Sequence, residues 1–218
     1  KVPGDFLQRR RRQPMLDVEG LSFARGKNTL FKSLSFSLKA GSALRVTGSN
    51  GSGKTSLLRL LAGLSRPDEG EILWCGEAIR KNYGDFVRSV NFLGHDDGLK
   101  NQLTATENLK LMLPLLGTSP SASEVVAALE EAGLDSVKDR AVMHMSAGQK
   151  RRVALARTDF MKHRALWILD EPFTSLDVTA VTALVVKLKR HIQFGGLLVF
   201  TTHQDLDVIP DANSLSLD

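Results

Sequence analysis

Apolar positions in the second half of the chain follow two patterns. Three short runs, at 90–94, 165–169 and 197–201, are almost continuously apolar, which is typical of strands buried on both faces in a parallel sheet. Between the last two runs, apolar residues recur at steps of three or four and form one face of a helix that ends near Gly195-Gly196. These residues are Val178, Val181, Val185, Leu188 and Ile192. The alternation of short strands with helices predicts a parallel α/β core.

The remainder of the chain has two other patterns. Apolar and polar residues alternate over 15–38, and 70–79 has a central Cys75-Gly76 turn, so both segments are predicted to form antiparallel strands. Helical spacing without a convincing strand runs from 104 to 160. We therefore expect an α/β domain with an antiparallel β subdomain and an inserted α-helical subdomain at about 99–160.

Size and charge narrow the classes of protein that fit this pattern. The chain has 218 residues, 42% of them hydrophobic, with a single cysteine and a formal net charge of +5. No apolar stretch reaches the ~18 residues that a membrane-spanning helix needs. Four of the positive charges form the run 9–12, in a segment without periodicity that we interpret as a disordered basic leader, 1–14. Residues 15–218 are expected to form a single domain.

The leader is expected to be a solvated tail. No aromatic residues interleave with its arginines, as they do in proteins that stack on single-stranded nucleic acid. We therefore expect no nucleic-acid partner. His163 and His191 are expected at exposed helix surfaces.

A glycine-rich segment at 48–55 fills every fixed position of the phosphate-binding loop pattern between a predicted strand and a predicted helix. Backbone N–H groups and the positive end of the helix would converge on a polyphosphate there. Lys54 is placed to reach the β- and γ-phosphates, and the Thr55 hydroxyl to coordinate Mg²⁺. The expected contacts come from Gly48, Ser49, Asn50, Gly51, Ser52, Gly53, Lys54, Thr55 and Ser56.

The apolar run at 166–169 ends in two carboxylates, Asp170 and Glu171. Ligands bind at the carboxyl ends of parallel strands, so both side chains are expected to face the nucleotide. Asp170 suits a Mg²⁺ ligand position, and Glu171 is placed to polarise a water for in-line attack on the γ-phosphate. The alternative is a helix N-cap after the strand.

The segment Met145-Ser146-Ala147-Gly148-Gln149, followed by a basic helix, resembles the signature of the ATP-binding-cassette family, Leu-Ser-Gly-Gly-Gln. The resemblance covers roughly 15–204 and includes the phosphate loop and the two carboxylates. It implies a P-loop NTPase fold of the ABC type. It also implies a homodimer in which Ser146, Gly148 and Gln149 of one subunit contact the ATP bound to the other.

The resemblance assigns further roles near the nucleotide. His203, after the last strand, would contact the γ-phosphate and hold the water and Glu171 in place. Asp177 would relay between the two sites. Lys54, Glu171 and His203 are thus the expected catalytic residues, with ATP and Mg²⁺ as cofactors.

Two positions depart from the general cassette pattern. Where most members stack an aromatic residue on adenine, this chain has Arg25, whose guanidinium plane can also stack on a base; Phe23 is a rival that fits better in the core. Most members also end the strand at 90–94 with a glutamine that touches Mg²⁺. Here His95 follows it, and because histidine can titrate where glutamine does not, its metal contact is in doubt.

With these departures, and with Gly98-Leu99-Lys100 and Thr201-Thr202, the chain resembles the ATP-binding subunits of cytochrome c maturation heme exporters. The resemblance implies a peripheral protein on the cytoplasmic face of the cell inner membrane, or on the matrix face of the mitochondrial one. Its partners would be integral membrane subunits, and its ATPase activity would drive release of heme from a chaperone. Met112, Leu115 and Leu116 are candidates for the docking surface, with internal packing as the alternative. Export of another cargo, and a soluble cassette acting on nucleic acid, remain alternative functions.

Overall fold

Two sheets and a group of helices make up the part of the chain that the computed structural model describes, residues 13–202 and 209–218. The first sheet is antiparallel with the strand order β2-β1-β4-β5. The second has the order β6-β7-β8-β3-β9, and its neighbouring strands pair in parallel. The predicted disordered leader falls almost entirely outside the described residues.

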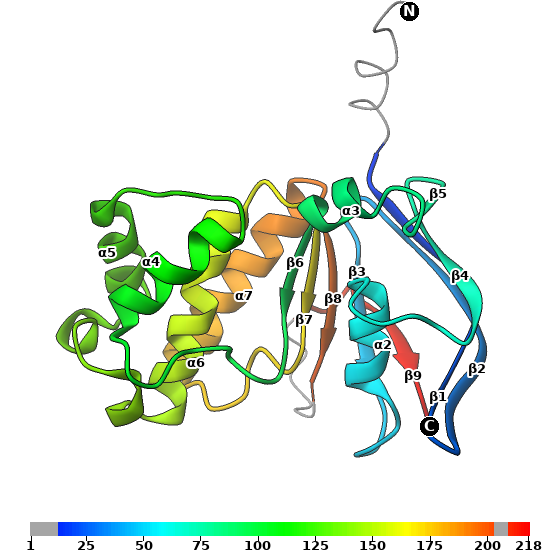
Figure 1. Cartoon of the computed structure of the whole chain (residues 1–218), viewed down its shortest axis with the longest axis horizontal. Helices are drawn as coiled ribbons and strands as arrows, with labels where there is room; N and C mark the ends of the chain where they lie inside the picture. Colours follow the sequence, from blue (N-terminus) through cyan, green and yellow to red (C-terminus); the bar gives the residue numbers. More distant parts are fainter. Residues whose placement is uncertain (1–12, 203–208) are drawn as a thin grey trace, which may run out of the picture.

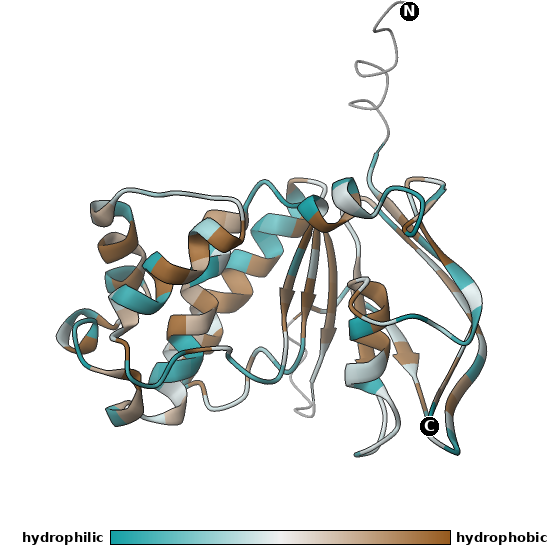
Figure 2. Cartoon of the chain, viewed as in Figure 1, coloured by the Kyte–Doolittle hydropathy of each residue, from teal (hydrophilic) through white to brown (hydrophobic). Residues whose placement is uncertain are grey.

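Every strand except the last, at 213–216, falls where the sequence patterns predicted one. Those of the first sheet are β1 (Met15–Arg25), β2 (Asn28–Lys39), β4 (Glu69–Trp74) and β5 (Glu77–Ala78). Those of the second are β3 (Ala43–Thr47), β6 (Val90–Leu93), β7 (Leu166–Leu169), β8 (Leu197–Thr201) and β9 (Asn213–Ser216). In β7 and β8 every residue is buried, as expected for strands covered on both faces. Figure 2 shows the predominantly hydrophobic colour of β6, β7 and β8.

The helices occupy two regions of the molecule (Figure 1). Those outside the insertion are α2 (Lys54–Leu61), α3 (Tyr83–Ser89) and α7 (Val178–Gln193). Those inside it are α4 (Ala105–Leu115), α5 (Ala122–Glu131), α6 (Ala147–Ala156), and the 3₁₀ turns η1 (Asp135–Val137), η2 (Val142–His144) and η3 (Arg157–Met161). Each of α4, α5 and α6 begins with a capping box, whose side-chain oxygen accepts a bond from the first turn.

Three hydrophobic clusters hold these layers together. The first lies between the two sheets and contains α2, so that the helix is enclosed by β1, β2 and β4 on one side and by the parallel strands on the other. The second packs α6 and α7 on the opposite face of the parallel sheet. The third fills the helical group. Helix α6 contributes to the last two clusters, so it joins the helical group to the sheet.

His191 on α7 is not an exposed helix-surface residue, and the expectation from sequence was wrong. Its imidazole stacks on the Trp167 indole with ring centroids 4.3 Å apart, and its Nε2 lies 3.1 Å from the Leu197 carbonyl oxygen. A Cβ at Gly196 would come within 2.2 Å of the ring. His191 is not among the apolar positions of the helical pattern, which therefore placed it on the polar face. The chain turns back at Gly195-Gly196 and covers the His191 ring.

Candidate nucleotide-binding site

The phosphate-binding loop joins β3 to α2. Three of its glycines have left-handed φ angles, 141° at Gly48, 87° at Gly51 and 103° at Gly53, a conformation that glycine adopts without steric cost. No side chain caps the N-terminus of α2, where Gly53 is the N-cap. The first N–H groups of that helix thus point into a concave turn that suits an anion.

Two side chains point to a ligand within this loop. The Lys54 ammonium group donates to the carbonyl oxygens of Gly48 at 2.8 Å and Ser49 at 2.9 Å. An ammonium group has three donors, so one remains after these two bonds. The hydroxyl of Ser52 is buried and has no hydrogen-bond partner in the structure. Because buried polar atoms are nearly always paired, this atom fits a phosphate oxygen as its missing partner.

The two carboxylates lie at the carboxyl end of β7, on the same edge of the sheet as the phosphate loop. Asp170 is only 1% exposed. Its Oδ2 accepts a 2.7 Å bond from the Thr55 hydroxyl, and its Oδ1 accepts another of 2.7 Å from Thr201. The structure thus brings together the two residues expected to hold Mg²⁺. A threonine hydroxyl that donates to a carboxylate keeps its lone pairs for a metal, so these groups fit the ion.

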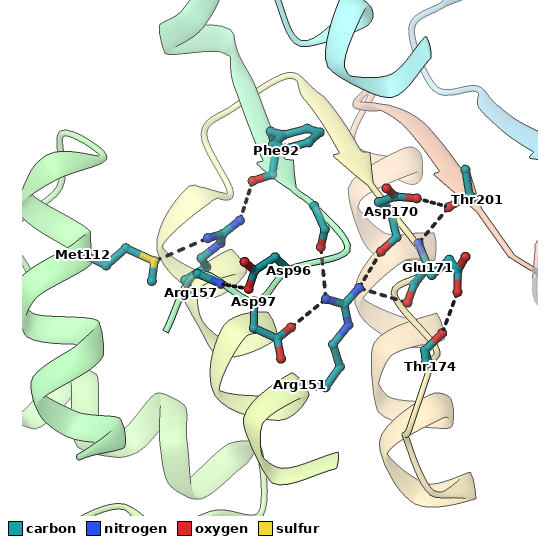
Figure 3. Close-up of polar contacts among 12 residues, drawn as sticks. Phe92, Asp96, Asp97, Met112, Arg151, Arg157, Asp170, Glu171, Thr174 and Thr201 are labelled. Atoms are coloured by element: carbon teal, nitrogen blue, oxygen red, sulfur yellow. Dashed lines mark hydrogen bonds and ion pairs between the residues drawn. The ribbon is translucent and has the colours of Figure 1, made fainter. Parts of the chain in front are cut away.

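Glu171 has an unusual backbone. Its φ angle is +48°, which a residue with a Cβ rarely adopts and which costs about 1–3 kcal/mol. Its N–H donates to the Thr201 hydroxyl at 2.8 Å, and its Oε2 accepts a 3.2 Å bond from Thr174 (Figure 3). The helix that follows, α7, has Asp177 as its N-cap, so the Asp170–Glu171 pair does not cap a helix. A network of contacts maintains the strained backbone of Glu171.

The signature segment lies apart from the phosphate loop of its own chain. Ser146 is the N-cap of α6, and the Gln149 side chain reaches back to its N–H at 2.9 Å. A Cβ at Gly148 would lie 2.5 Å from the Ser175 carbonyl oxygen, so α6 and the loop before α7 are in close contact. Strands β6, β7 and β8 separate α6 from α2 (Figure 1). One chain therefore does not join the two predicted halves of the site.

The residues expected to contact adenine belong to the β1–β2 hairpin, which packs against the phosphate loop. A Cβ at Gly53 would be 3.0 Å from Leu30, so β2 packs against this loop. Arg25 is exposed at the end of β1, where it pairs with Asn28 across the hairpin. Phe23 stacks on Phe31 with ring centroids 6.2 Å apart and packs against the core. Arg25 is therefore the more accessible of the two.

For three other residues, the predicted contacts with the nucleotide, the metal or the second site stay predictions. His95 is exposed in the loop that follows β6, and its contact with Mg²⁺ stays a prediction. His203 lies outside the described residues. Asp177 is the N-cap of α7, where its Oδ1 accepts a 2.8 Å bond from the Ala180 N–H.

Three side chains that sequence reasoning did not assign to the site lie within it. Thr201, at the end of β8, joins Asp170 to the Glu171 backbone. Asp218 accepts a 2.7 Å bond from the Ser49 N–H, and this bond lowers the pKa of its carboxyl group. Arg151 of α6 contacts the backbone of both carboxylate residues. The sequence signal for Thr201 was its place at the end of a buried strand; the other two have no local signal.

Comparison with known proteins identifies this arrangement. The family model for the ABC transporter matches residues 31–174, more than half of the chain and a range that includes the phosphate loop, the signature and both carboxylates. This chain belongs to the ABC transporter family. It is an ABC-type ATPase, and its two sheets with inserted helices are the ABC fold.

Individual ABC proteins resemble the chain over most of its length. The "Cytochrome c biogenesis ATP-binding export protein CcmA" of Salmonella typhi is 47% identical over 192 residues, 88% of this chain and 91% of the relative. A bacterial Atm1-family ABC exporter with ATP bound superposes with a TM-score of 0.80 at 25% identity, covering 94% of this chain and 37% of that one. A putative ABC transporter ATP-binding protein from Pyrococcus furiosus gives 0.78 at 23% identity, covering 93% and 97%, and supports the fold alone.

Proposed function

We propose that two copies of this chain bind two ATP molecules between them, each held by the phosphate loop of one copy and the signature of the other. The observation that carries the proposal is the separation of α6 from α2 by the parallel strands within one chain. The uncapped N-terminus of α2 supplies one anion site. Ser146 and Gly148 at the start of α6 supply the other. The dimer is isologous and closes when nucleotide fills both halves.

Within each site the described residues divide the chemistry among them. Lys54 and the loop N–H groups bind the β- and γ-phosphates, and Arg25 stacks on the adenine. Thr55 and Asp170 hold Mg²⁺, which screens phosphate charge when bound. Glu171 accepts a proton from the water that attacks the γ-phosphate, yielding ADP and phosphate. His203 orients that water and His95 approaches the metal; these two assignments rest on the family resemblance.

We further propose that the ATPase powers heme export in cytochrome c biogenesis, in which it drives release of heme from a chaperone. The 47% identity to an export protein of cytochrome c biogenesis supports this cargo over lipid or peptide. In the described part of the chain, no helix is long and apolar enough to span a bilayer. The resemblance to an export protein supports separate membrane subunits that complete the complex, with this chain bound peripherally to the cytoplasmic face of the inner membrane. A bacterial relative favours that membrane over the mitochondrial one.

Helix α4 offers a docking surface for such a subunit. Leu111 is 49% exposed and Leu115 83% exposed, and they lie four residues apart on one face of the helix. Met112 and Leu116 are half-buried, and Leu116 packs into the third cluster, so internal packing explains these two positions better. Of the three residues that the sequence suggested for the docking surface, Leu115 remains a candidate.

The test uses Glu171→Gln in the assembled membrane complex. We expect ATP binding to persist while hydrolysis falls at least ~100-fold, because a positioned proton acceptor is lost. The variant should accumulate as an ATP-bound closed dimer, measured by cross-linking between copies. Cells that carry it should lose covalent heme in c-type cytochromes, measured by heme staining.

A second variant isolates the shared site. Ser146→Arg should leave ATP binding to a single copy intact and abolish the cross-link. An ATP-dependent dimer that forms equally well in this variant would contradict binding across the interface. Normal turnover in Glu171→Gln would remove that residue from its role.

A further inference from the structure

A single guanidinium group joins the signature helix to the catalytic end of the sheet. Arg151, in the middle of α6, is 5% exposed. Its NH2 donates to the Asp170 carbonyl oxygen at 2.6 Å and to the Glu171 carbonyl oxygen at 2.9 Å. Its NH1 donates to the Gly94 carbonyl oxygen at 3.2 Å and forms a 2.8 Å ion pair with Asp97. Figure 3 shows this fan of contacts reaching two strand ends from one helix.

The strand ends that Arg151 joins are already neighbours. β6 and β7 pair in parallel, and the Asp170 N–H donates to the Leu93 carbonyl oxygen at 2.7 Å. The Arg151 contacts therefore extend the β6–β7 pairing beyond its last residues, into the two loops that face the nucleotide. The planar fork of an arginine suits this geometry, because it directs several donors at once to fixed acceptors.

Arg151 contacts the backbone of Glu171, which is strained. Glu171 has a φ angle of +48°, and the direction of its side chain depends on that angle being kept. Thr201 fixes the N–H of this residue, and Arg151 fixes its carbonyl oxygen. The peptide units on both sides of the Glu171 Cα are thus held, one from β8 and one from α6.

Arg157, the first residue of η3 directly after α6, supports the same junction. It donates to the Phe92 carbonyl oxygen and lies 3.4 Å from the Met112 sulfur. Removal of its guanidinium from water lowers the pKa of Arg157 to about 10, with a further contribution from repulsion by Arg151. Arg151 of α6 and Arg157 of η3 therefore both bind the carboxyl end of β6, and of the two Arg151 also reaches β7.

We propose that Arg151 is a positioning residue that makes the hydrolytic orientation of Glu171 depend on where the signature helix sits. Ser146 and Arg151 lie five residues apart on α6, about 7.5 Å along the helix axis. When α6 shifts to engage the ATP of the partner copy, Arg151 carries that shift to the Glu171 backbone and to the loop 94–97. Hydrolysis is thereby coupled to dimer closure. The inference rests on the proposed role of Glu171.

The experiment compares Arg151→Lys with Arg152→Lys in the assembled complex. Lysine keeps the charge of Arg151 but is a point donor that cannot reach both strand ends at once. We expect kcat to fall about 10- to 100-fold, as for small misplacements of a catalytic group, with the dissociation constant for ATP changed less than about 3-fold. Arg152 lies on the same helix and donates to Ala132 and Gly133, away from the carboxylates. Its variant should keep kcat within about 2-fold.

A double-mutant cycle with Glu171→Gln separates positioning from general destabilisation. If Arg151 acts through Glu171, Arg151→Lys should slow hydrolysis no further in the Glu171→Gln background. Additive losses, or a kcat for Arg151→Lys within 2-fold of wild type, would overturn the inference. Normal turnover in Glu171→Gln alone would instead refute the proposed base, which is a distinct outcome.

A second variant covers the case in which Arg151→Lys folds poorly. Asp97→Asn removes only the charge of the ion-pair partner and leaves the carbonyl contacts of Arg151 in place. The expected result is a smaller loss of kcat, again with ATP binding unchanged. A weaker ATP affinity with normal kcat would contradict the proposal.

Discussion

Thr201 shows how one hydroxyl group organises two acidic residues. It donates to Asp170 Oδ1 and accepts from the Glu171 N–H, and it is fully buried at the end of β8. In the sheet, β8 lies between β7, which ends at the carboxylates, and β3, which leads into the phosphate loop. A hydroxyl is required there, because only a group that both donates and accepts can make the two bonds.

Thr201→Val should therefore impair both stability and catalysis. The valine has nearly the same shape but leaves one carboxylate oxygen and one N–H of the buried site unpaired. Each lost partner costs about 1–3 kcal/mol, so the free energy of unfolding should fall by that order in denaturant titrations. ATP turnover should fall with it. Thr201→Ser, which keeps the hydroxyl, is the control and should retain most of both; an unchanged Thr201→Val would show that water replaces the hydroxyl.

The ten residues of helix α6 make three kinds of contribution. Its first turn carries the signature, its apolar side fills two hydrophobic clusters, and Arg151 contacts the strand ends. The capping box of Ser146 and Gln149 could have been predicted from the Ser-x-x-Gln spacing. The close approach of Gly148 to the Ser175 carbonyl oxygen could not, because it depends on a loop almost thirty residues away.

Gly148→Ala tests whether the close contact between Gly148 and the Ser175 carbonyl oxygen sets the position of α6. A Cβ at 2.5 Å from a backbone oxygen cannot be accommodated without moving α6 or the loop that carries Ser175. We expect ATP binding to a single copy to persist and the ATP-dependent cross-link to weaken several-fold. Ala147→Gly changes the neighbouring exposed position by one methyl group and should leave the cross-link intact. Equal cross-linking in both variants would make the contact incidental.

At the scale of the whole molecule, α7 closes the parallel sheet on the side away from α2. Leu184 and Leu188 pack into the second cluster, and His191 covers Trp167. Burial lowers the pKa of His191, although its bonds to backbone carbonyl oxygens act in the opposite direction. The folded protein therefore holds this imidazole neutral at a pH where the unfolded chain already binds a proton.

This difference predicts how the stability of the fold depends on pH. Because the unfolded state takes up the proton first, stability falls as pH drops below the ordinary value near 6.5 and continues to fall towards the lowered pKa of the folded state. His191→Phe keeps a ring against Trp167 but does not titrate, so its unfolding free energy should vary less between about pH 5 and 7. His163→Gln, at an exposed position, controls for loss of one histidine. An unchanged pH slope in His191→Phe would refute the assignment.

The chain's sequence by itself determined the local elements and the chemistry they carry. Continuous apolar runs predicted the buried strands, and the glycine pattern at 48–55 predicted the turn after β3, because short-range sterics and periodicity decide both. Tertiary structure decided the rest. It placed Thr201 and Arg151 on the Asp170–Glu171 backbone, stacked His191 on Trp167, and kept α6 away from α2. These contacts join residues far apart in the chain, and no local pattern encodes which distant backbone groups will need a partner.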